Sequence, residues 1–128
     1  IVSVVKEKLY VGCGLRSLSR EHKEYHGIYC GALEKRDAAY HQGTAWGFLL
    51  GGFLSAYLKV NHHSNESVKE ALKMLEPVTA HLSDNGCIGS ISEIFDGDAP
   101  HNPRGCYAQA WSVGEVLRAY TQDILPYL

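Results

Sequence analysis

Residues 45–60 form the segment that most constrains the fold of this chain. Large apolar side chains occur there on nearly every side of a helical projection, and small residues fill the other positions. A helix that is apolar all round is buried, and Thr44 is a good N-cap for it. The uncharged run 41–58 is short for a membrane span and holds four glycines, which argues against a transmembrane helix. The small residues let neighbouring helices approach closely, so we expect an inner helix of a helical barrel.

Three other segments have the apolar periodicity of two-faced helices. Residues 1–10 form one amphipathic helix, residues 66–83 form a second that Ser64 or Asn65 can cap, and residues 107–125 form the last. Residues 15–43 lack this periodicity and read as a long polar loop with room for short strands. The sequence therefore predicts an all-α fold of about four helices with long loops, which matches part of an α/α barrel.

Length and charge place the chain among ordinary globular domains. It has 128 residues, 45% hydrophobic content and a net charge of −2, so a basic surface for nucleic acid or an anionic membrane is not expected. Its four cysteines are widely spaced, which favours buried free thiols in an intracellular protein and leaves two disulfides open for a secreted one. Because Ile1 opens directly into an apolar-periodic segment, we expect residues 1–128 to be a single partial domain of a larger protein.

Residues 89–105 gather the chain's acid/base chemistry. The sequence there is Gly-Ser-Ile-Ser-Glu-Ile-Phe-Asp-Gly-Asp-Ala-Pro-His-Asn-Pro-Arg-Gly. It predicts a short extended piece ending in a rigid turn, which can hold a carboxylate beside apolar walls. Glu93 can act there as a general base, or it can bond to loop amides or pair with Arg104. Asp96 and Asp98 flank Gly97 and are better suited to capping a turn. A calcium site is less expected, because the segment does not follow the EF-hand pattern.

A second group of candidates lies just before the apolar segment. Tyr40, His41 and Gln42 can hydrogen-bond a polyhydroxylated ligand, or they can fix the loop and the helix start. Trp46 and Trp111 can stack on a sugar ring, although tryptophans at helical spacing more often belong to a core. The sequence has no metal-ligand cluster, nucleophile motif or phosphate loop, so no cofactor is expected. Carboxylates that can act as acid or base, in a helical chain rich in tyrosine and tryptophan, favour a carbohydrate as the substrate.

Four stretches of the chain carry a resemblance to a known family. They are Gly14-Leu15-Arg16-Ser17-Leu18; Arg36-Asp37-Ala38-Ala39-Tyr40-His41-Gln42-Gly43-Thr44 with Trp46; Ile91-Ser92-Glu93-Ile94-Phe95-Asp96-Gly97-Asp98; and Pro103-Arg104-Gly105-Cys106 with Ala108-Gln109-Ala110-Trp111-Ser112-Val113. Together they resemble the C-terminal part of the amylo-α-1,6-glucosidase domain of glycogen debranching enzymes. The chain departs from the family at Ala45, where valine is common, and at Gly47, where proline is common.

The resemblance implies a cytoplasmic glycoside hydrolase that removes the single α-1,6-linked glucose from a trimmed glycogen branch with inversion. It implies the C-terminal portion of an (α/α)6 toroid, the six-hairpin glycosidase fold, in which Glu93 is the general base. The general acid, an aspartate, belongs to an earlier part of the toroid. The implied partner is an α-glucan, the glycogen limit dextrin. The substrate-binding residues expected here are His41, Gln42, Trp46, Tyr40 and Asp96.

Part of a toroid cannot close a ring, so its inner helices would expose apolar faces. We therefore expect residues 1–128 alone to be inactive, with the rest of the domain or a second copy covering those faces. Two alternatives stay open. One is a noncatalytic helical module that binds glucan or stabilises a partner domain, and the other is a toroid that acts on a different glycoside.

Overall fold

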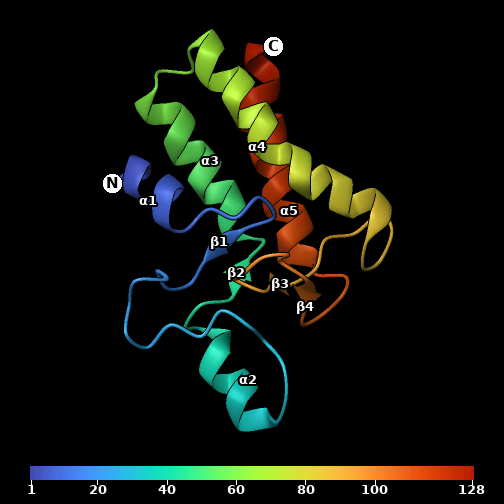
Figure 1. The fold of residues 1–128 in the computed structure, drawn as a ribbon. Coiled ribbons are helices and arrows are strands. Elements are labelled where there is room, and N and C mark those ends of the chain that lie inside the picture. The colour runs from blue at the N-terminus through green and yellow to red at the C-terminus, as the bar shows by residue number, and fades with distance from the viewer.

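The computed structural model describes all of residues 1–128 and contains both helices and a sheet (Figure 1). The helices are α1 (Val2–Lys8), α2 (Leu33–Tyr40), α3 (Leu49–Val60), α4 (Asn65–Asp84) and α5 (Ala110–Ala119). A π-helical turn (Tyr120–Ile124) and a 3-10 turn (Leu125–Tyr127) continue α5. The strands are β1 (Leu15–Arg16), β2 (Ala45–Trp46), β3 (Ile94–Phe95) and β4 (Pro103–Arg104).

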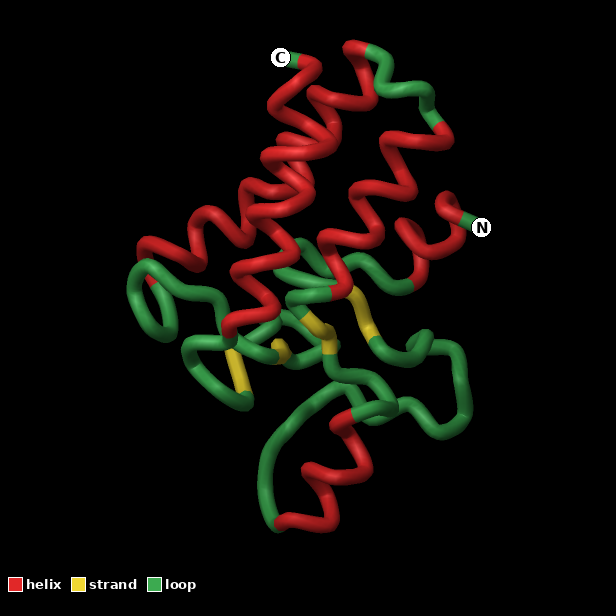
Figure 2. The backbone as a smooth tube through the Cα atoms, turned by 180° about the vertical axis from the view of Figure 1, so that it is seen from behind, coloured by secondary structure: helices red, strands yellow, loops and turns green.

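The four short strands form one antiparallel sheet in the order β1-β2-β3-β4. Leu15 pairs with Trp46, Trp46 with Ile94, and Ile94 with Arg104, so one row of residues crosses the whole sheet. Figures 1 and 2 both place these strands between α2 and the group formed by α3, α4 and α5. The prediction of an all-α fold, as the C-terminal portion of an (α/α)6 toroid, is therefore wrong for this chain. Strands of two residues are too short to produce an alternating apolar pattern. The sequence therefore allowed short strands within 15–43 and an extended piece within 89–105, but it did not reveal that four strands pair into one sheet.

The predicted helices are present, with boundaries that their end residues explain. Helix α1 ends before Gly12 as expected, and the Ser64 hydroxyl caps α4 by accepting a hydrogen bond from the Ser67 amide. Thr44 does not cap the apolar helix, because the chain passes first through β2 and α3 begins only at Leu49. The Thr44 hydroxyl instead donates to the Tyr40 carbonyl at 2.7 Å.

The core lies between α3, α4 and α5 and rests on the sheet. Leu50, Leu54 and Leu58 of α3 are fully buried there. At Gly51 a Cβ would lie 2.6 Å from the Glu115 carbonyl oxygen of α5, so the small residue does permit close helix packing. Helix α3 is not buried on every side, however, because Gly52 and Ala56 are exposed.

Residues 15–43 contain a helix that the sequence did not reveal. Helix α2 buries only Ala39, so it has no apolar stripe to produce a periodic signal. Its last residue, Tyr40, reaches the sheet, while most of the helix faces outward.

Of the two alternatives, free thiols or two disulfides, the structure has free thiols at all four cysteines. Cys30 and Cys106 are exposed, however, and not buried as expected. Burial raises the pKa of the Cys13 thiol to about 11. None of the helices combines the length and the apolar content that crossing a membrane requires.

Candidate active site

The backbone of Glu93 is hydrogen-bonded on both sides, directly before β3. Its amide donates to the Cys106 carbonyl at 2.8 Å, and its carbonyl accepts from the Gly47 amide at 3.3 Å. The bond from Gly47 continues the register between β2 and β3, and the bond to Cys106 ties Glu93 to the segment that follows β4. The position of the Glu93 Cα is therefore set by the sheet.

The carboxylate of Glu93 is held by two donors from distant parts of the chain. The Tyr40 hydroxyl donates to Oε1, and the Cys106 amide donates to Oε2 at 2.9 Å. Gly105 closes the site from one side, since a Cβ there would lie 2.5 Å from Oε2. Its φ of +66° also lies in the left-handed region, which glycine adopts without strain. Glu93 is half-buried, so its carboxylate is fixed without being removed from solvent.

Tyr40 is held as firmly as the carboxylate that it contacts. Its carbonyl accepts from the Thr44 hydroxyl at 2.7 Å and from the Trp46 indole at 3.1 Å. Its ring packs at a steep angle on Trp46, with centroids 4.7 Å apart, and more loosely on Tyr29 at 5.7 Å. Burial, then the hydrogen bond to Glu93 and the negative charge of that carboxylate, raise the pKa of Tyr40 to about 12.

An aromatic cavity of about 340 Å³ adjoins the sheet beside β2. Its lining consists of Ser17, His41, Trp46, Phe48, Leu49 and Trp111. The His41 ring lies parallel to the Trp46 ring, at 5.2 Å and 3°, and covers one of its faces. Trp46 is only 5% exposed, whereas Trp111 is 50% exposed. The aromatic surface that a sugar could reach here is therefore offered by His41 and Trp111, with Trp46 behind them.

Asp96 is completely buried and its oxygens accept internal donors. Arg104 contacts both oxygens, with Nη2 at 2.9 Å from Oδ2, and the Tyr29 amide donates to Oδ1 at 2.9 Å. The Asn102 side-chain amide adds a longer contact at 3.4 Å. The hydrogen bond to Asp96 raises the pKa of the Arg104 guanidinium. Arg104 thus pairs with Asp96 and not with Glu93, and Asp96 ties the Tyr29 loop to β4.

Asp98 and Gln42 fix the loop before α2. The Tyr25 hydroxyl donates to Asp98 Oδ1 at 3.0 Å, and Arg20 approaches the same oxygen at 3.1 Å. The Gln42 carbonyl accepts from the His26 amide at 2.6 Å. Of the predicted residues, Tyr40 lies against Glu93, whereas Trp46 and His41 line the aromatic cavity and pack on Tyr40.

Two contributors to this site were not predicted from the sequence. The Cys106 amide is a backbone donor, which no side-chain pattern can reveal, and Gly105 matters for the room it leaves beside Glu93. The glycine that ends the 89–105 segment was the one available signal. The predicted role of Tyr40 as a ligand contact also omitted its bond to Glu93, 53 residues away along the chain.

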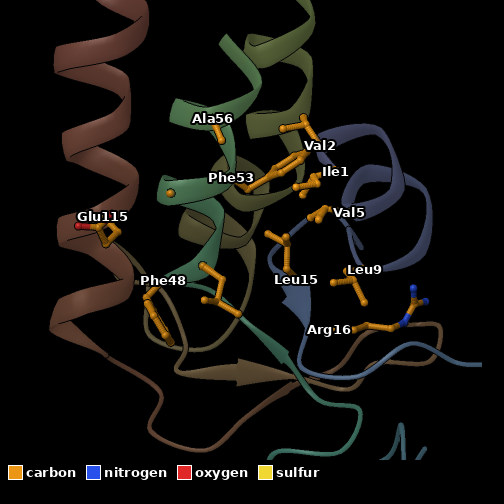
Figure 3. Close-up of a pocket in the computed structure, with 12 residues that line it drawn as sticks. Ile1, Val2, Val5, Leu9, Leu15, Arg16, Phe48, Phe53, Ala56 and Glu115 are labelled. Carbon is orange, nitrogen blue, oxygen red and sulfur yellow. The ribbon is translucent and has the colours of Figure 1, made fainter. Parts of the chain in front are cut away.

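A second cavity, of about 650 Å³, shares Phe48 and Leu49 with the aromatic one and has a different character. Figure 3 shows side chains from α1 and α3 facing one another across it, with Glu115 of α5 at one side. Most of its lining is aliphatic, including Val2, Val5 and Leu15. It has few polar groups to orient a sugar, so we assign the candidate site to the aromatic cavity and Glu93.

Nowhere in residues 1–128 do three or more His, Cys, Asp or Glu side chains come together in a way that could hold a metal ion. Comparison with protein families gives a match to the family described as Amylo-alpha-1,6-glucosidase over residues 1–118. This match covers most of the 128 residues, and the chain belongs to that family.

Proposed function

We propose that this member of the amylo-α-1,6-glucosidase family supplies the water-activating carboxylate of a glycogen debranching enzyme, and that Glu93 is the general base. The observation that carries the proposal is the half-buried carboxylate of Glu93, which is fixed at both oxygens and is linked through Tyr40 to Trp46, a residue of the aromatic cavity. A base must be oriented and must remain accessible to water, and Glu93 meets both conditions.

The proposed reaction is hydrolysis of an α-1,6-glucosidic bond with inversion. A Glu93 oxygen accepts a proton from water as that water attacks the anomeric carbon, on the face opposite the departing oxygen. Each carboxylate oxygen has a second lone pair besides the one that Tyr40 or Cys106 occupies, so one remains for the water. A carboxylic acid on the other side protonates the leaving oxygen, at the separation of roughly 6.5–9.5 Å that admits water.

The acid of this pair is proposed to lie outside residues 1–128. Asp96 is buried in its ion pair with Arg104, and Asp98 is held by Tyr25 and Arg20. Neither carboxylate is free to approach a glycosidic oxygen opposite Glu93. We therefore propose that residues 1–128 form a single unit that is one part of a larger glucosidase domain.

The aromatic cavity is the proposed site for the glucose ring. His41 and Trp111 present exposed ring faces, and sugars pack well on such faces because their C–H surfaces are apolar. Gln42 is half-buried next to His41 and offers an amide for hydroxyl groups. Trp46 supports His41 from behind, and Asp96 supports the loop that carries Tyr29.

Glu93→Gln in the full-length protein tests the proposal. The amide keeps the shape of the side chain but cannot take a proton, so the rate of glucose release from an α-1,6-branched dextrin is expected to fall on the order of 10²- to 10⁴-fold. Glucan binding should survive. Glu34→Gln, on the exposed face of α2, is the matched control and should leave the rate unchanged.

If Glu93→Gln retains full turnover, the proposal is wrong. If the full-length Glu93→Gln protein keeps both its turnover and its glucan binding, residues 1–128 would instead be a noncatalytic glucan-binding module of that protein.

A further inference from the structure

We propose that Tyr40 is a positioning residue that sets the orientation of the Glu93 carboxylate, rather than a residue that binds substrate. The inference rests on the proposed role of Glu93 as the base. The contact that supports it is a hydrogen bond: the hydroxyl of Tyr40, the last residue of α2, donates to Glu93 Oε1.

The ring of Tyr40 is packed by aromatic neighbours on several sides. Its centroid lies 4.7 Å from Trp46, 4.9 Å from His41 and 5.7 Å from Tyr29. The two hydrogen bonds that its carbonyl accepts also fix its backbone. The hydroxyl therefore reaches Glu93 from a side chain with little freedom to rotate, which is what a preorganised donor requires.

The two donors on Glu93 act together to restrict the carboxylate. Tyr40 holds Oε1 and the Cys106 amide holds Oε2, so rotation of the carboxylate would break both bonds. A carboxylate held in this way presents its remaining lone pairs in fixed directions. The attacking water then meets a base that is already oriented, and its placement contributes to the rate.

The Tyr40 phenol keeps its proton, and so remains a hydrogen-bond donor, at neutral pH. Its pKa of about 12 keeps the phenol protonated at neutral pH, so it does not compete with Glu93 for the proton of the water. A hydroxyl directed at Glu93 is also engaged before any sugar arrives. This prior engagement favours an action through Glu93 over a direct contact with substrate.

The position of Tyr40 depends in turn on Asp96. The Tyr29 amide donates to the buried Asp96 carboxylate at 2.9 Å, and the Tyr29 ring packs on Tyr40. Helix α2 has only Ala39 buried, so its own packing holds it weakly. The Asp96–Arg104 ion pair thus holds Tyr29, whose ring packs on Tyr40 and helps to fix its position.

The test compares Tyr40→Phe with Tyr127→Phe in the full-length protein, using α-1,6-branched dextrin. Tyr40→Phe removes the donor to Glu93 and is expected to lower kcat on the order of 10- to 100-fold with KM unchanged. Tyr127→Phe removes the hydroxyl of an exposed tyrosine that stacks on His63 and has no contact with the site, so it should leave kcat near the wild-type value. In a Glu93→Gln background, Tyr40→Phe should cause no further loss, because the two residues act as a unit.

The inference is overturned by a raised KM with unchanged kcat in Tyr40→Phe, by equal losses in Tyr40→Phe and Tyr127→Phe, or by additive losses in the double variant. Full turnover in Glu93→Gln would overturn the proposed function and this inference together. Loss in Glu93→Gln with wild-type kcat in Tyr40→Phe would overturn this inference alone.

A second variant keeps the test decisive if Tyr40→Phe folds poorly. Thr44→Val removes one hydrogen bond to the Tyr40 carbonyl and leaves the phenol intact. It should lower kcat by a smaller factor, again with KM unchanged, and wild-type kcat in a folded Thr44→Val protein would count against the positioning role.

Discussion

Gly105→Ala is the substitution that most directly tests how Glu93 is placed. An alanine Cβ at this position would lie 2.5 Å from Glu93 Oε2 and 3.1 Å from Ile94 Cγ1. Real Cβ atoms do not approach a neighbour so closely, and the flexible carboxylate gives way before the backbone does. Glu93 would then lose its bond to the Cys106 amide, its bond to Tyr40, or both.

The substitution is expected to lower both the folding stability and the rate, for different reasons. Alanine in the left-handed conformation costs about 1 kcal/mol of folding free energy. Loss of the hydrogen bond from the Cys106 amide adds about 1.5 kcal/mol, the low end for charged acceptors because Glu93 is only half-buried. Displacing a catalytic group by about 1 Å can cost on the order of 100-fold in rate, so activity should suffer far more than stability.

Gly89→Ala is the matched control for this experiment. Gly89 has φ of +82°, so alanine suffers a similar backbone strain there, but a Cβ would meet no atom within 4 Å. Initial rates of glucose release and thermal unfolding curves should be measured for both variants. Gly105→Ala is expected to lose about 100-fold in kcat, and Gly89→Ala should stay near the wild-type rate. Equal loss of activity in the two variants would refute the reasoning, since only position 105 touches Glu93.

Two further predictions concern stability. Asp96→Asn should lower the free energy of unfolding by about 2–3 kcal/mol, because it leaves Arg104 without its buried partner. The control Asp98→Asn breaks an ion pair with the exposed Arg20 and should lower it by under about 1 kcal/mol. Similar urea midpoints for the two variants would contradict the role given to Asp96. Burial lowers the pKa of His81 below its ordinary value of 6.5, so the stability it contributes is present above about pH 6.5 and is lost as the pH falls through its folded pKa. The thermal midpoint should therefore decrease between pH 7 and pH 5, less steeply in His81→Gln, and an unchanged slope in that variant would assign the acid sensitivity to other groups.

The helices could be predicted from the sequence where burial leaves a periodic trace. Helix α4 begins at Asn65 after the Ser64 cap because a hydroxyl acceptor and an apolar stripe coincide there. Helix α2 left no such trace, since only Ala39 is buried. The sheet could not be predicted, although short extended segments could, because pairing between two-residue segments is decided by tertiary contacts and not by local alternation.

The candidate site shows the same division between local and distant information. Glu93 was identified because one short segment combines carboxylates with apolar neighbours and glycine boundaries. Its partners could not be identified in this way, because Tyr40 lies 53 residues away and the Cys106 donor is a backbone amide. The parallel packing of His41 on Trp46 was equally hidden, and it changes which aromatic faces a sugar can reach.

The sheet and the aromatic residues control different properties of Glu93. Because the Glu93 amide and carbonyl are both paired, the backbone can shift only if neighbouring strands shift with it. The direction of the carboxylate depends instead on single contacts from Tyr40 and Cys106. Substitutions in the strands should therefore reduce stability and activity together, whereas substitutions at Tyr40 or Gly105 should reduce activity first. A fold with such short strands can hold a base in this way because each strand has only two residues to place, and those of β1, β2 and β3 are buried, with Leu15, Ala45 and Phe95 in the core that the helices form.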